Sequence, residues 1–284
     1  MDRFSKFNPK VTFLFFLCVI VIDFVMSDPF CLAIGLAGAF LFNLRLQGKK
    51  ALKELVAFAL PIVALSAVFN MVFTSWGSTV LFTLLSKPFT LEGLFYGFSR
   101  GLMFAGVIMW ISCYSLVLST DRFLAVFSNV VPNISLLLSA VLSFIPRLRE
   151  NAREINESRM LLNEDKGKLQ KSLDNFSSLL SMTLEESIEM SDSMRARGFN
   201  KNRRAYSKYI FSVSDLIMLL SICVLFVLII ALKMKGCSSF VYEPEISFNG
   251  FLPVSAIACF LLSFLPLFVD LTEDIKWFYL KQKI

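Results

Sequence analysis

The stretch 211–232, FSVSDLIMLLSICVLFVLIIAL, decides the fold because it carries a single charge along its whole length. Wound as a helix, it is long enough to cross about 30 Å of hydrocarbon. Similar runs with few or no charges occupy 11–26, 55–73 and 251–269. Hydrophobic residues make up 56% of the 284, well above the share in an ordinary soluble domain. The sequence therefore predicts an all-α protein, a polytopic membrane helical bundle.

The distribution of Lys and Arg orients the predicted spans. We expect six spans, at 11–26, 30–44, 55–73, 91–118, 211–232 and 251–270. Basic residues concentrate at the N-terminus, in 45–53, in 146–209 and after the last span, whereas 27–29 and 236–250 contain none. Cytoplasmic loops carry the excess of positive charge. Together with the even number of spans, this predicts a multi-pass protein of the cell membrane with both termini in the cytoplasm.

Two further apolar pieces do not fit as spans. Thr79–Leu85 is too short, and we expect it to return into the outer leaflet or to pack on other helices. Phe123–Ile145 is interrupted at Val131-Pro132-Asn133, and counting it as a span would place the next basic stretch outside. We therefore expect helices in or just beneath the cytoplasmic interface there, packed against the bundle. A turn at Asp28-Pro29 is expected between the first two spans.

The composition changes abruptly between Pro146 and Tyr209, where Lys and Arg are interspersed with Asp and Glu. No apolar run in this segment is long enough to span a membrane. The chain thus divides into N-terminal transmembrane helices at 1–120, cytoplasmic or interfacial coupling helices at 121–210, and C-terminal transmembrane helices with a short cytoplasmic tail at 211–284.

Two helices are predicted in the charged insert. The first begins near Pro146, a favoured first-turn residue, and reaches Leu162. The second runs from about Ser172 to Arg197. Side chains spaced three or four residues apart form one mostly apolar stripe along it, made of Leu173, Phe176, Leu180, Leu184, Ile188, Ser191 and Met194 or Arg195. Gly198 follows where a left-handed residue is expected to end the helix.

Arg195 and Arg197 fall in the last turn of this second helix, beside carbonyls that have no intrahelical partner. In one interpretation they are a basic cap, favourable to the negative end of the helix dipole. In the other, the helix end is a plug that offers a planar guanidinium to an acidic or carbonyl-lined groove on a partner. The residues alone leave both interpretations open.

The composition excludes several chemistries. The chain has no His, so a Ser-His-Asp triad, an HExxH zinc site and a His-ligated haem are impossible within it. The six Cys form no CxxC pair. Neither Gly48-Lys49 nor Gly167-Lys168 is preceded by the Gly that a Walker A loop requires. We expect no catalytic residues, no metal site, no cofactor and no nucleic-acid partner.

The end of the second predicted helix resembles a family motif. Its residues Met194-Arg195-Ala196-Arg197-Gly198-Phe199 are similar to the second Ala-Arg-Gly motif of the transmembrane T component of energy-coupling factor transporters. The stretch from Thr120-Asp121 through Ile145-Pro146-Arg147-Leu148 to Ser158-Arg159 is similar to the approach to that family's first motif. Phe7-Asn8-Pro9-Lys10-Val11 precedes the first span much as Asp-Pro-Arg-Thr-Lys does there. The resemblance covers most of the chain in order.

The chain departs from the family at the first motif, where Ser158-Arg159-Met160 stands in place of Ala-Arg-Gly. The Arg and a small residue before it are kept, but the Gly is lost. Without a helix-ending Gly, the helix is predicted to continue past Arg159 to Leu162 or Asn163.

The resemblance implies a non-catalytic subunit of an ATP-driven importer in a bacterial or archaeal plasma membrane. Its partners in the bilayer and the cytoplasm would be a small substrate-binding S component and two ATP-binding-cassette ATPase subunits. The implied ATPase-coupling residues are Arg159 and Arg197, with Ser158, Ala196 and Gly198 beside them. Each Arg-bearing helix end would seat in a groove of one ATPase, so that closure on ATP moves the S component. The implied task is uptake of a vitamin or of a cobalt or nickel ion.

A stand-alone secondary transporter is the first alternative, because intramembrane charges serve as ion or proton relays in such proteins. The candidates are Asp23 in the first span and the Glu92–Arg100 pair. We interpret Asp23 instead as a buried polar contact within the bundle or against the S component. Asp215 and Asp270 are expected near helix ends, where solvation is cheap.

A membrane enzyme is the second alternative. It would use Asp270, Glu273 and Asp274 to hold a divalent cation. In the other interpretation, the same residues form a solvated acidic face beside Lys276 and bind no cation.

Overall fold

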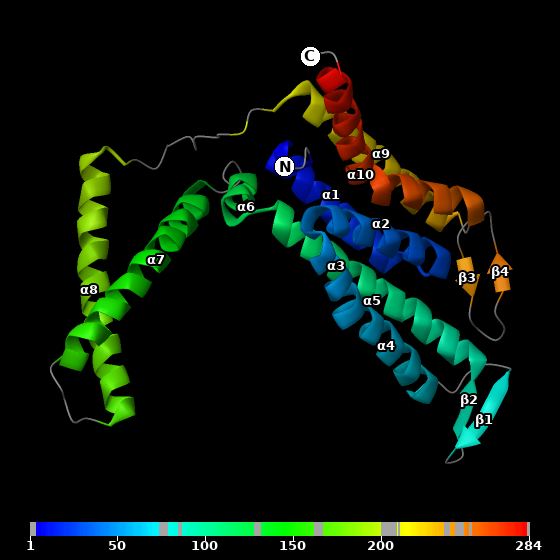
Figure 1. Ribbon diagram of the computed structural model, residues 1–284, viewed down its shortest axis with the longest axis horizontal. Coiled ribbons are helices and arrows are strands. Elements are labelled where there is room, and N and C mark those ends of the chain that lie inside the picture. Colours follow the sequence, from blue (N-terminus) through cyan, green and yellow to red (C-terminus); the bar gives the residue numbers. More distant parts are fainter. Residues whose placement is uncertain are drawn as a thin grey trace. The chain divides into compact units, whose positions relative to one another are not determined.

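The computed structural model describes residues 4–73, 79–84, 87–127, 132–161, 167–199, 209, 211–235, 239–241, 247–249 and 252–282. Figure 1 shows the helices and strands of these residues. The chain divides into two compact units. Unit 1 combines Met1–Ser119 with Tyr209–Ile284, and unit 2 is Thr120–Lys208. The limits of unit 2 lie next to those drawn from the sequence for the insert, 121 and 210.

Unit 1 is a helical bundle. Its helices are α1 (Pro9–Val25), α2 (Pro29–Gln47), α3 (Lys49–Glu54), α4 (Leu60–Phe73), α5 (Leu91–Val117), α9 (Val213–Met234) and α10 (Leu252–Gln282), preceded by the 3-10 turn η1 (Phe4–Lys6). A π-helical turn, η2 (Leu55–Ala59), joins α3 to α4, so that Lys49–Phe73 is one helical stretch. The predicted all-α class is confirmed.

Among the described residues of unit 1, five helical stretches are long and apolar enough to cross a membrane: Pro29–Gln47, Lys49–Phe73, Leu91–Val117, Val213–Met234 and Pro253–Thr272. They make the chain a multi-pass membrane protein. The first of the six predicted spans corresponds to α1, whose 17 residues lie at the lower limit for crossing hydrocarbon as a helix. Apolar runs located the other five within six residues of the ends of these stretches, although α10 itself continues to Gln282.

Proline sets the beginning of the first two helices. Pro9 and Pro29 occupy the first turn of α1 and α2, where the missing N–H removes no helical hydrogen bond. Asn8 caps α1, because its side-chain oxygen accepts from the backbone N–H two residues later at 3.2 Å. The helix breaks between Val25 and Pro29, where the turn at Asp28-Pro29 was expected.

Aromatic rings form a tightly buried part of the unit 1 core. Phe4, Phe15, Phe16, Phe42 and Trp110 are each at most 1% exposed. The centroid of the Phe4 ring lies 5.2 Å from Phe15 and 5.7 Å from Phe42, and both pairs meet edge to face. The indole of Trp110 meets Phe15 at 5.8 Å in the same way. Such pairs stabilise by roughly 0.5–1.5 kcal/mol beyond the area they bury, and here they join η1, α1, α2 and α5.

Two glycines bring α4 and α5 into close contact. A Cβ added to Gly97 would lie 2.7 Å from the carbonyl oxygen of Ser66, and one added to Gly101 would lie 2.7 Å from the Cα of Val63. The hydroxyl of Ser66 donates to the carbonyl of Gly97 at 3.0 Å. Small residues with a hydroxyl beside them are the usual means of helix association in lipid, where the hydrophobic effect offers no preference between helix and bilayer.

Two short hairpins connect helices of unit 1. Strand β1 (Val80–Leu84) pairs antiparallel with β2 (Lys87–Thr90), and β3 (Ser239–Val241) pairs antiparallel with β4 (Ser247–Asn249). The segment 79–85 thus contributes a strand, which the sequence analysis did not anticipate. A run too short to span can satisfy its backbone by pairing with a neighbouring strand. Thr79 anchors the start of the first hairpin by donating from its hydroxyl to Glu92 of α5 at 2.8 Å.

Unit 2 contains α6 (Thr120–Phe127), α7 (Pro132–Leu161) and α8 (Lys168–Ala196). The prediction that its first long helix begins at Pro146 is wrong, because α7 begins at Pro132 and contains Pro146. Pro132 also suits a first turn. Proline inside a helix removes one backbone hydrogen bond and costs about 3 kcal/mol. The second helix begins four residues earlier than expected and ends at Ala196, one residue before the expected end, with Arg197 as its C-cap.

Candidate functional site: the helix ends of unit 2

The end of α8 has the predicted geometry. Gly198 has φ +76°, in the left-handed region that favours glycine. Its N–H donates to the carbonyl of Arg195 at 2.9 Å, and the N–H of Phe199 donates to the carbonyl of Met194 at 3.1 Å. These two bonds are the pattern of a Schellman motif, with Arg197 as the C-cap. The helix therefore stops sharply and leaves Arg197 at its tip.

The side chains at this tip face solvent. Arg195, Ala196, Arg197 and Gly198 are all exposed. Exposed carbonyls at a helix C-terminus carry partial negative charge, which favours arginine there. Exposure does not distinguish Arg195 from Arg197, because both are exposed. The basic-cap interpretation and the docking interpretation therefore differ only in whether Arg197 binds a partner.

The predicted stripe along α8 is also exposed. Five of its apolar members have exposed fractions between 46% and 65%, namely Leu173, Phe176, Leu180, Leu184 and Ile188, whereas Met194 is half-buried. Side chains at this spacing lie along one face of a helix. Exposed apolar faces of this kind are typical of surfaces that contact another protein or a membrane.

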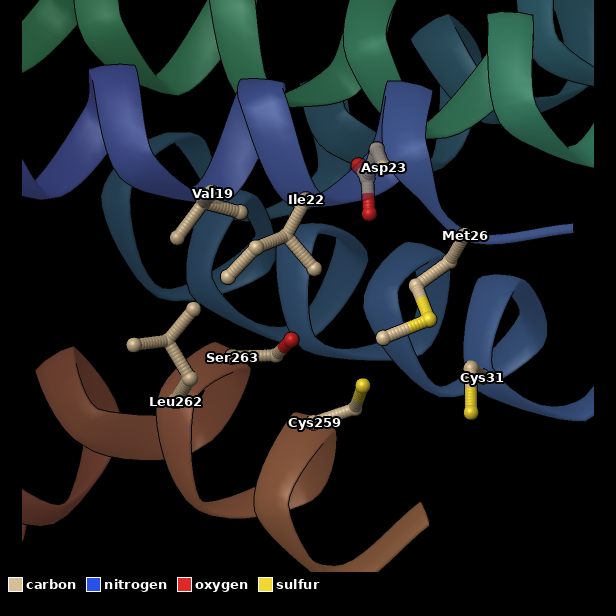
Figure 2. A pocket seen from close by; sticks show the side chains of 8 residues that line it. All are labelled: Val19, Ile22, Asp23, Met26, Cys31, Cys259, Leu262 and Ser263. Carbon is tan, nitrogen blue, oxygen red and sulfur yellow. The ribbon is translucent and has the colours of Figure 1, made fainter. Parts of the chain in front are cut away.

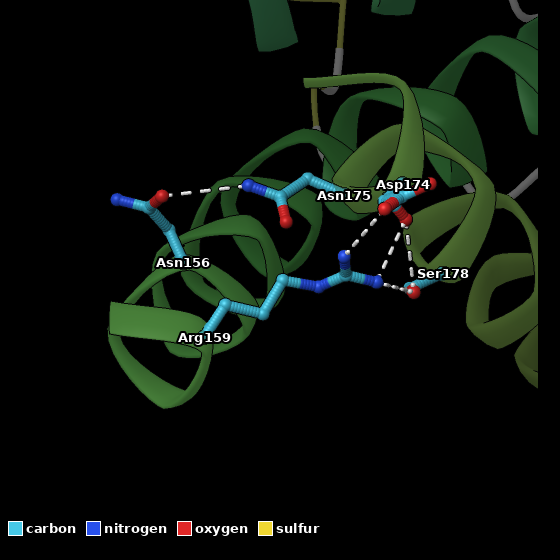
Figure 3. Close-up of polar contacts among 5 residues, drawn as sticks. All are labelled: Asn156, Arg159, Asp174, Asn175 and Ser178. Carbon is cyan, nitrogen blue, oxygen red and sulfur yellow. Dashed lines mark hydrogen bonds and ion pairs between the residues drawn. The ribbon is translucent and has the colours of Figure 1, made fainter. Parts of the chain in front are cut away.

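Arg159 is placed differently from Arg197. It lies inside α7, which continues to Leu161, as expected from Met160 in place of Gly. Its guanidinium Nη2 donates to the carbonyl of Asp174 at 3.1 Å and to the hydroxyl of Ser178 at 2.9 Å (Figure 3). Its Nη1 lies 3.5 Å from the Asp174 carboxylate, and the Arg159 side chain is 26% exposed. The neighbouring Ser158 is exposed.

Further polar contacts join α7 to α8. The amide of Asn175 donates to Asn156 at 3.4 Å, also drawn in Figure 3. Farther along, the amide of Asn151 donates to Glu186 at 3.1 Å. Since residues late in α7 meet residues early in α8, and earlier ones meet later ones, the two helices run antiparallel. The sequence analysis missed Asp174 and Ser178, whose spacing of four residues was their only signal.

Asp23 lies within the bundle of unit 1. It is 5% exposed, and its Oδ2 has no hydrogen-bond partner among the described residues. Glycines of α2 and α5 approach it closely, because a Cβ on Gly35 would lie 2.9 Å from Oδ1 and one on Gly106 would lie 3.2 Å from Oδ2. Figure 2 shows the carboxylate at a cavity with room for about one water, lined also by Cys31, Cys259 and Ser263.

The expectation for Asp215 and Asp270 was wrong about solvation, because both carboxylates are buried. For Asp270 it was also wrong about position, because α10 continues past it to Gln282. Asp270 accepts from the N–H of Phe4 at 3.2 Å and lies 3.5 Å from the guanidinium Nε of Arg45. Asp215 completes a capping box with Ser212 at the start of α9 and accepts from the N–H of Asn8 at 3.1 Å. Hydrogen bonds and an ion pair replace the solvation that was expected.

Glu92 and Arg100, the other charged candidates, lie on α5. Glu92 is 2% exposed and accepts from both the N–H and the hydroxyl of Thr79. The guanidinium of Arg100 lies over the ring of Tyr96 at 5.0 Å. Both groups therefore have structural contacts of their own.

A polar cluster around Glu54 escaped the sequence analysis. The Glu54 carboxylate accepts from the amides of Asn43 and Gln47 at 2.9 and 3.2 Å, and from the hydroxyl of Ser112 at 2.7 Å. It ties α2, α3 and α5 together. Its one signal was a lone acid directly before the apolar run 55–73.

No metal centre is formed by the side chains that the structure describes, since no three of their Cys, Asp and Glu groups cluster. The side chains of Glu273 and Asp274, proposed above with Asp270 for a cation, lie outside the described set.

Comparison with known proteins adds no assignment: no family model matches this chain, and neither does any curated protein.

Proposed function

We propose that this chain is the transmembrane coupling subunit of an energy-coupling factor importer. It is a non-catalytic scaffold that transmits the motion of two cytoplasmic ATPase subunits to a membrane S component, which binds a vitamin or a cobalt or nickel ion. The observation that carries the proposal is the end of α8, where an exposed apolar stripe leads to Arg197 at a sharp Schellman stop. This surface belongs to a helical unit separate from the apolar bundle.

In this proposal, unit 1 anchors the chain in the membrane and unit 2 binds the ATPase partners. Unit 1 supplies the apolar helices that hold the chain in the bilayer. Unit 2 offers the partners a helix end with a planar guanidinium, which can hydrogen-bond to carboxylates or carbonyls in a groove. The apolar stripe of α8 adds the area that such a contact needs to be stable.

Transmission of motion requires that α7 and α8 move together. The contacts of Arg159, Asn151 and Asn175 fasten them at separate points along their length. Closure of the ATPase pair on ATP would displace the end of α8, and the fastened pair would carry that displacement toward the membrane as a lever. The ATP-binding residues belong to the ATPase subunits, in keeping with the absence of a Walker A loop from this sequence.

Arg197→Ala tests the proposal. Truncating one partner of a buried charge pair costs roughly 2–5 kcal/mol, or about 30-fold to several thousandfold in affinity. We expect the variant to lose co-purifying ATPase subunits or to hydrolyse ATP without uptake, and Arg197→Lys to restore only part of the activity because an ammonium lacks the planar fork.

Arg195→Ala is the matched control. Two residues apart on a helix, the two side chains point about 200° apart, so Arg195→Ala should be tolerated much better. Equal mild effects at both positions, with uptake normal, would mean that these arginines are only a solvated cap. Purification of the wild-type chain from native membranes without two ATPase chains and a small hydrophobic subunit would also count against the proposal.

A stand-alone secondary transporter is the second candidate, and the burial of Asp23 beside a small cavity favours it. An intramembrane carboxylate is a natural relay for a proton or cation. Substrate-coupled ion flux in liposomes that contain this chain alone would support it.

A further inference from the structure

The two arginines that resemble family motifs have unlike surroundings. Arg197 sits at the tip of α8, exposed, after which the chain turns away at Gly198. Arg159 sits two residues before the last described residue of α7, with about three quarters of its side chain covered. Met160 lets α7 continue past Arg159, whereas Gly198 ends α8 directly after Arg197.

Residues of α8 already bind much of the Arg159 guanidinium. One nitrogen, Nη2, donates to a backbone carbonyl and a hydroxyl of α8, and the other, Nη1, faces the Asp174 carboxylate. The hydroxyl of Ser178 also donates to the carbonyl of Asp174 at 3.0 Å, which closes a small ring of polar contacts (Figure 3). Charge-assisted bonds of a planar fork are about twice as strong as neutral ones. An acceptor on an ATPase could pair with both terminal nitrogens only by displacing these bonds.

We propose that Arg159 is a positioning residue that clasps α7 to α8, and that Arg197 is the one of the two motif arginines that reaches an ATPase. The docking half of this inference rests on the proposed function, whereas the clasp does not. The two helix ends then contact the ATPase pair unequally: the α8 end contributes a guanidinium, and the α7 end contributes position. This differs from the equivalent roles that the family resemblance implies.

The clasp is tested on the full chain in nanodiscs, without partners, by hydrogen–deuterium exchange. Arg159→Ala should raise exchange in peptides from 147–161 and 168–182 by about tenfold, because the charged hydrogen bonds that hold the two helices together are lost. Ser178→Ala should raise exchange in the same peptides to a smaller degree. Arg197→Ala is the matched control and should leave them unchanged. Unchanged exchange in Arg159→Ala would overturn the clasp.

The docking half is tested with the ATPase subunits that co-purify with the full chain. Their affinity for Arg197→Ala should fall at least 30-fold and lose much of its salt dependence, because the charge that contacts the partner is gone. Arg159→Ala should keep the wild-type salt dependence and lose affinity less than tenfold. Arg159→Lys should recover most of the exchange protection, since an ammonium still reaches the carboxylate and carbonyl.

The outcomes separate the two ideas. If Arg159→Ala loses affinity and salt dependence as Arg197→Ala does, while exchange stays at the wild-type level, Arg159 is a docking residue and the inference fails. If no ATPase binds the wild-type chain, the proposed function and the docking half fail together, and the exchange measurements alone decide the clasp.

Discussion

At the scale of single residues, Asp23 is a buried carboxylate that its surroundings stabilise little. Its Oδ2 lacks a hydrogen-bond partner among the described residues, and glycine backbones face it on two sides. An ionised carboxylate within a membrane costs about 2.5–3.5 kcal/mol on insertion scales. We therefore predict that Asp23→Asn, which keeps the shape and removes the charge, leaves uptake intact and the thermal unfolding temperature unchanged or higher.

Gly35→Ala is the control for this prediction. The Cβ of the new alanine would lie 2.9 Å from the Asp23 carboxylate, so this variant should lower the unfolding temperature. Uptake assays in cells and thermal unfolding of the purified chain measure the two effects. Abolished uptake by an Asp23→Asn variant that assembles normally would favour a transport relay instead.

At the scale of elements, the contact between α4 and α5 depends on the absence of a side chain at Gly97. A Cβ there would lie 2.7 Å from the carbonyl oxygen of Ser66 and 2.8 Å from the Cα of Ala67, and backbone atoms cannot rotate away. We predict that Gly97→Ala separates the two helices and lowers the free energy of unfolding by about 1–3 kcal/mol. Gly167→Ala is the matched control, since nothing lies within 4 Å of its Cβ position and its φ is −60°. Equal unfolding midpoints for both variants in denaturant titrations would contradict the close packing.

At the scale of the whole molecule, the contacts of unit 1 gather residues near one end of its apolar stretches, which in α10 is Pro253–Thr272. Phe4 and Arg45 both meet Asp270, and Asn8 meets Asp215. The hairpins β1–β2 and β3–β4 join the opposite ends of α4 to α5 and of α9 to α10 (Figure 1). This is the alternation expected of helices that cross a membrane in turn.

Cysteine labelling tests the orientation. In a chain whose native cysteines are replaced, Ser247→Cys in β4 should react with an impermeant reagent from outside the cell. Gly167→Cys, before α8, should react only after permeabilisation. Labelling of position 167 in intact cells would reverse the orientation and remove the ATPase docking argument with it.

Much of the fold was predictable, because a bilayer leaves few choices. A segment in hydrocarbon must satisfy its own backbone hydrogen bonds, so an apolar run of sufficient length is a helix. The same local logic located the end of α8, since Gly198 supplies the conformation that ends a helix. The beginning of α7 was missed because Pro132 and Pro146 both suit a first turn, and neighbouring residues alone do not decide between them.

The sequence by itself therefore determined the helices, the charged insert between them and the stop after Arg197. Only the tertiary structure decided that Arg159 binds α8 while Arg197 is exposed, and that Asp270 is buried against Phe4, 266 residues earlier in the chain. Helix formation depends on bonds between residues four apart, which a sequence displays directly. The partner of a side chain depends on which helix faces meet, and that is settled by packing between residues far apart in the sequence.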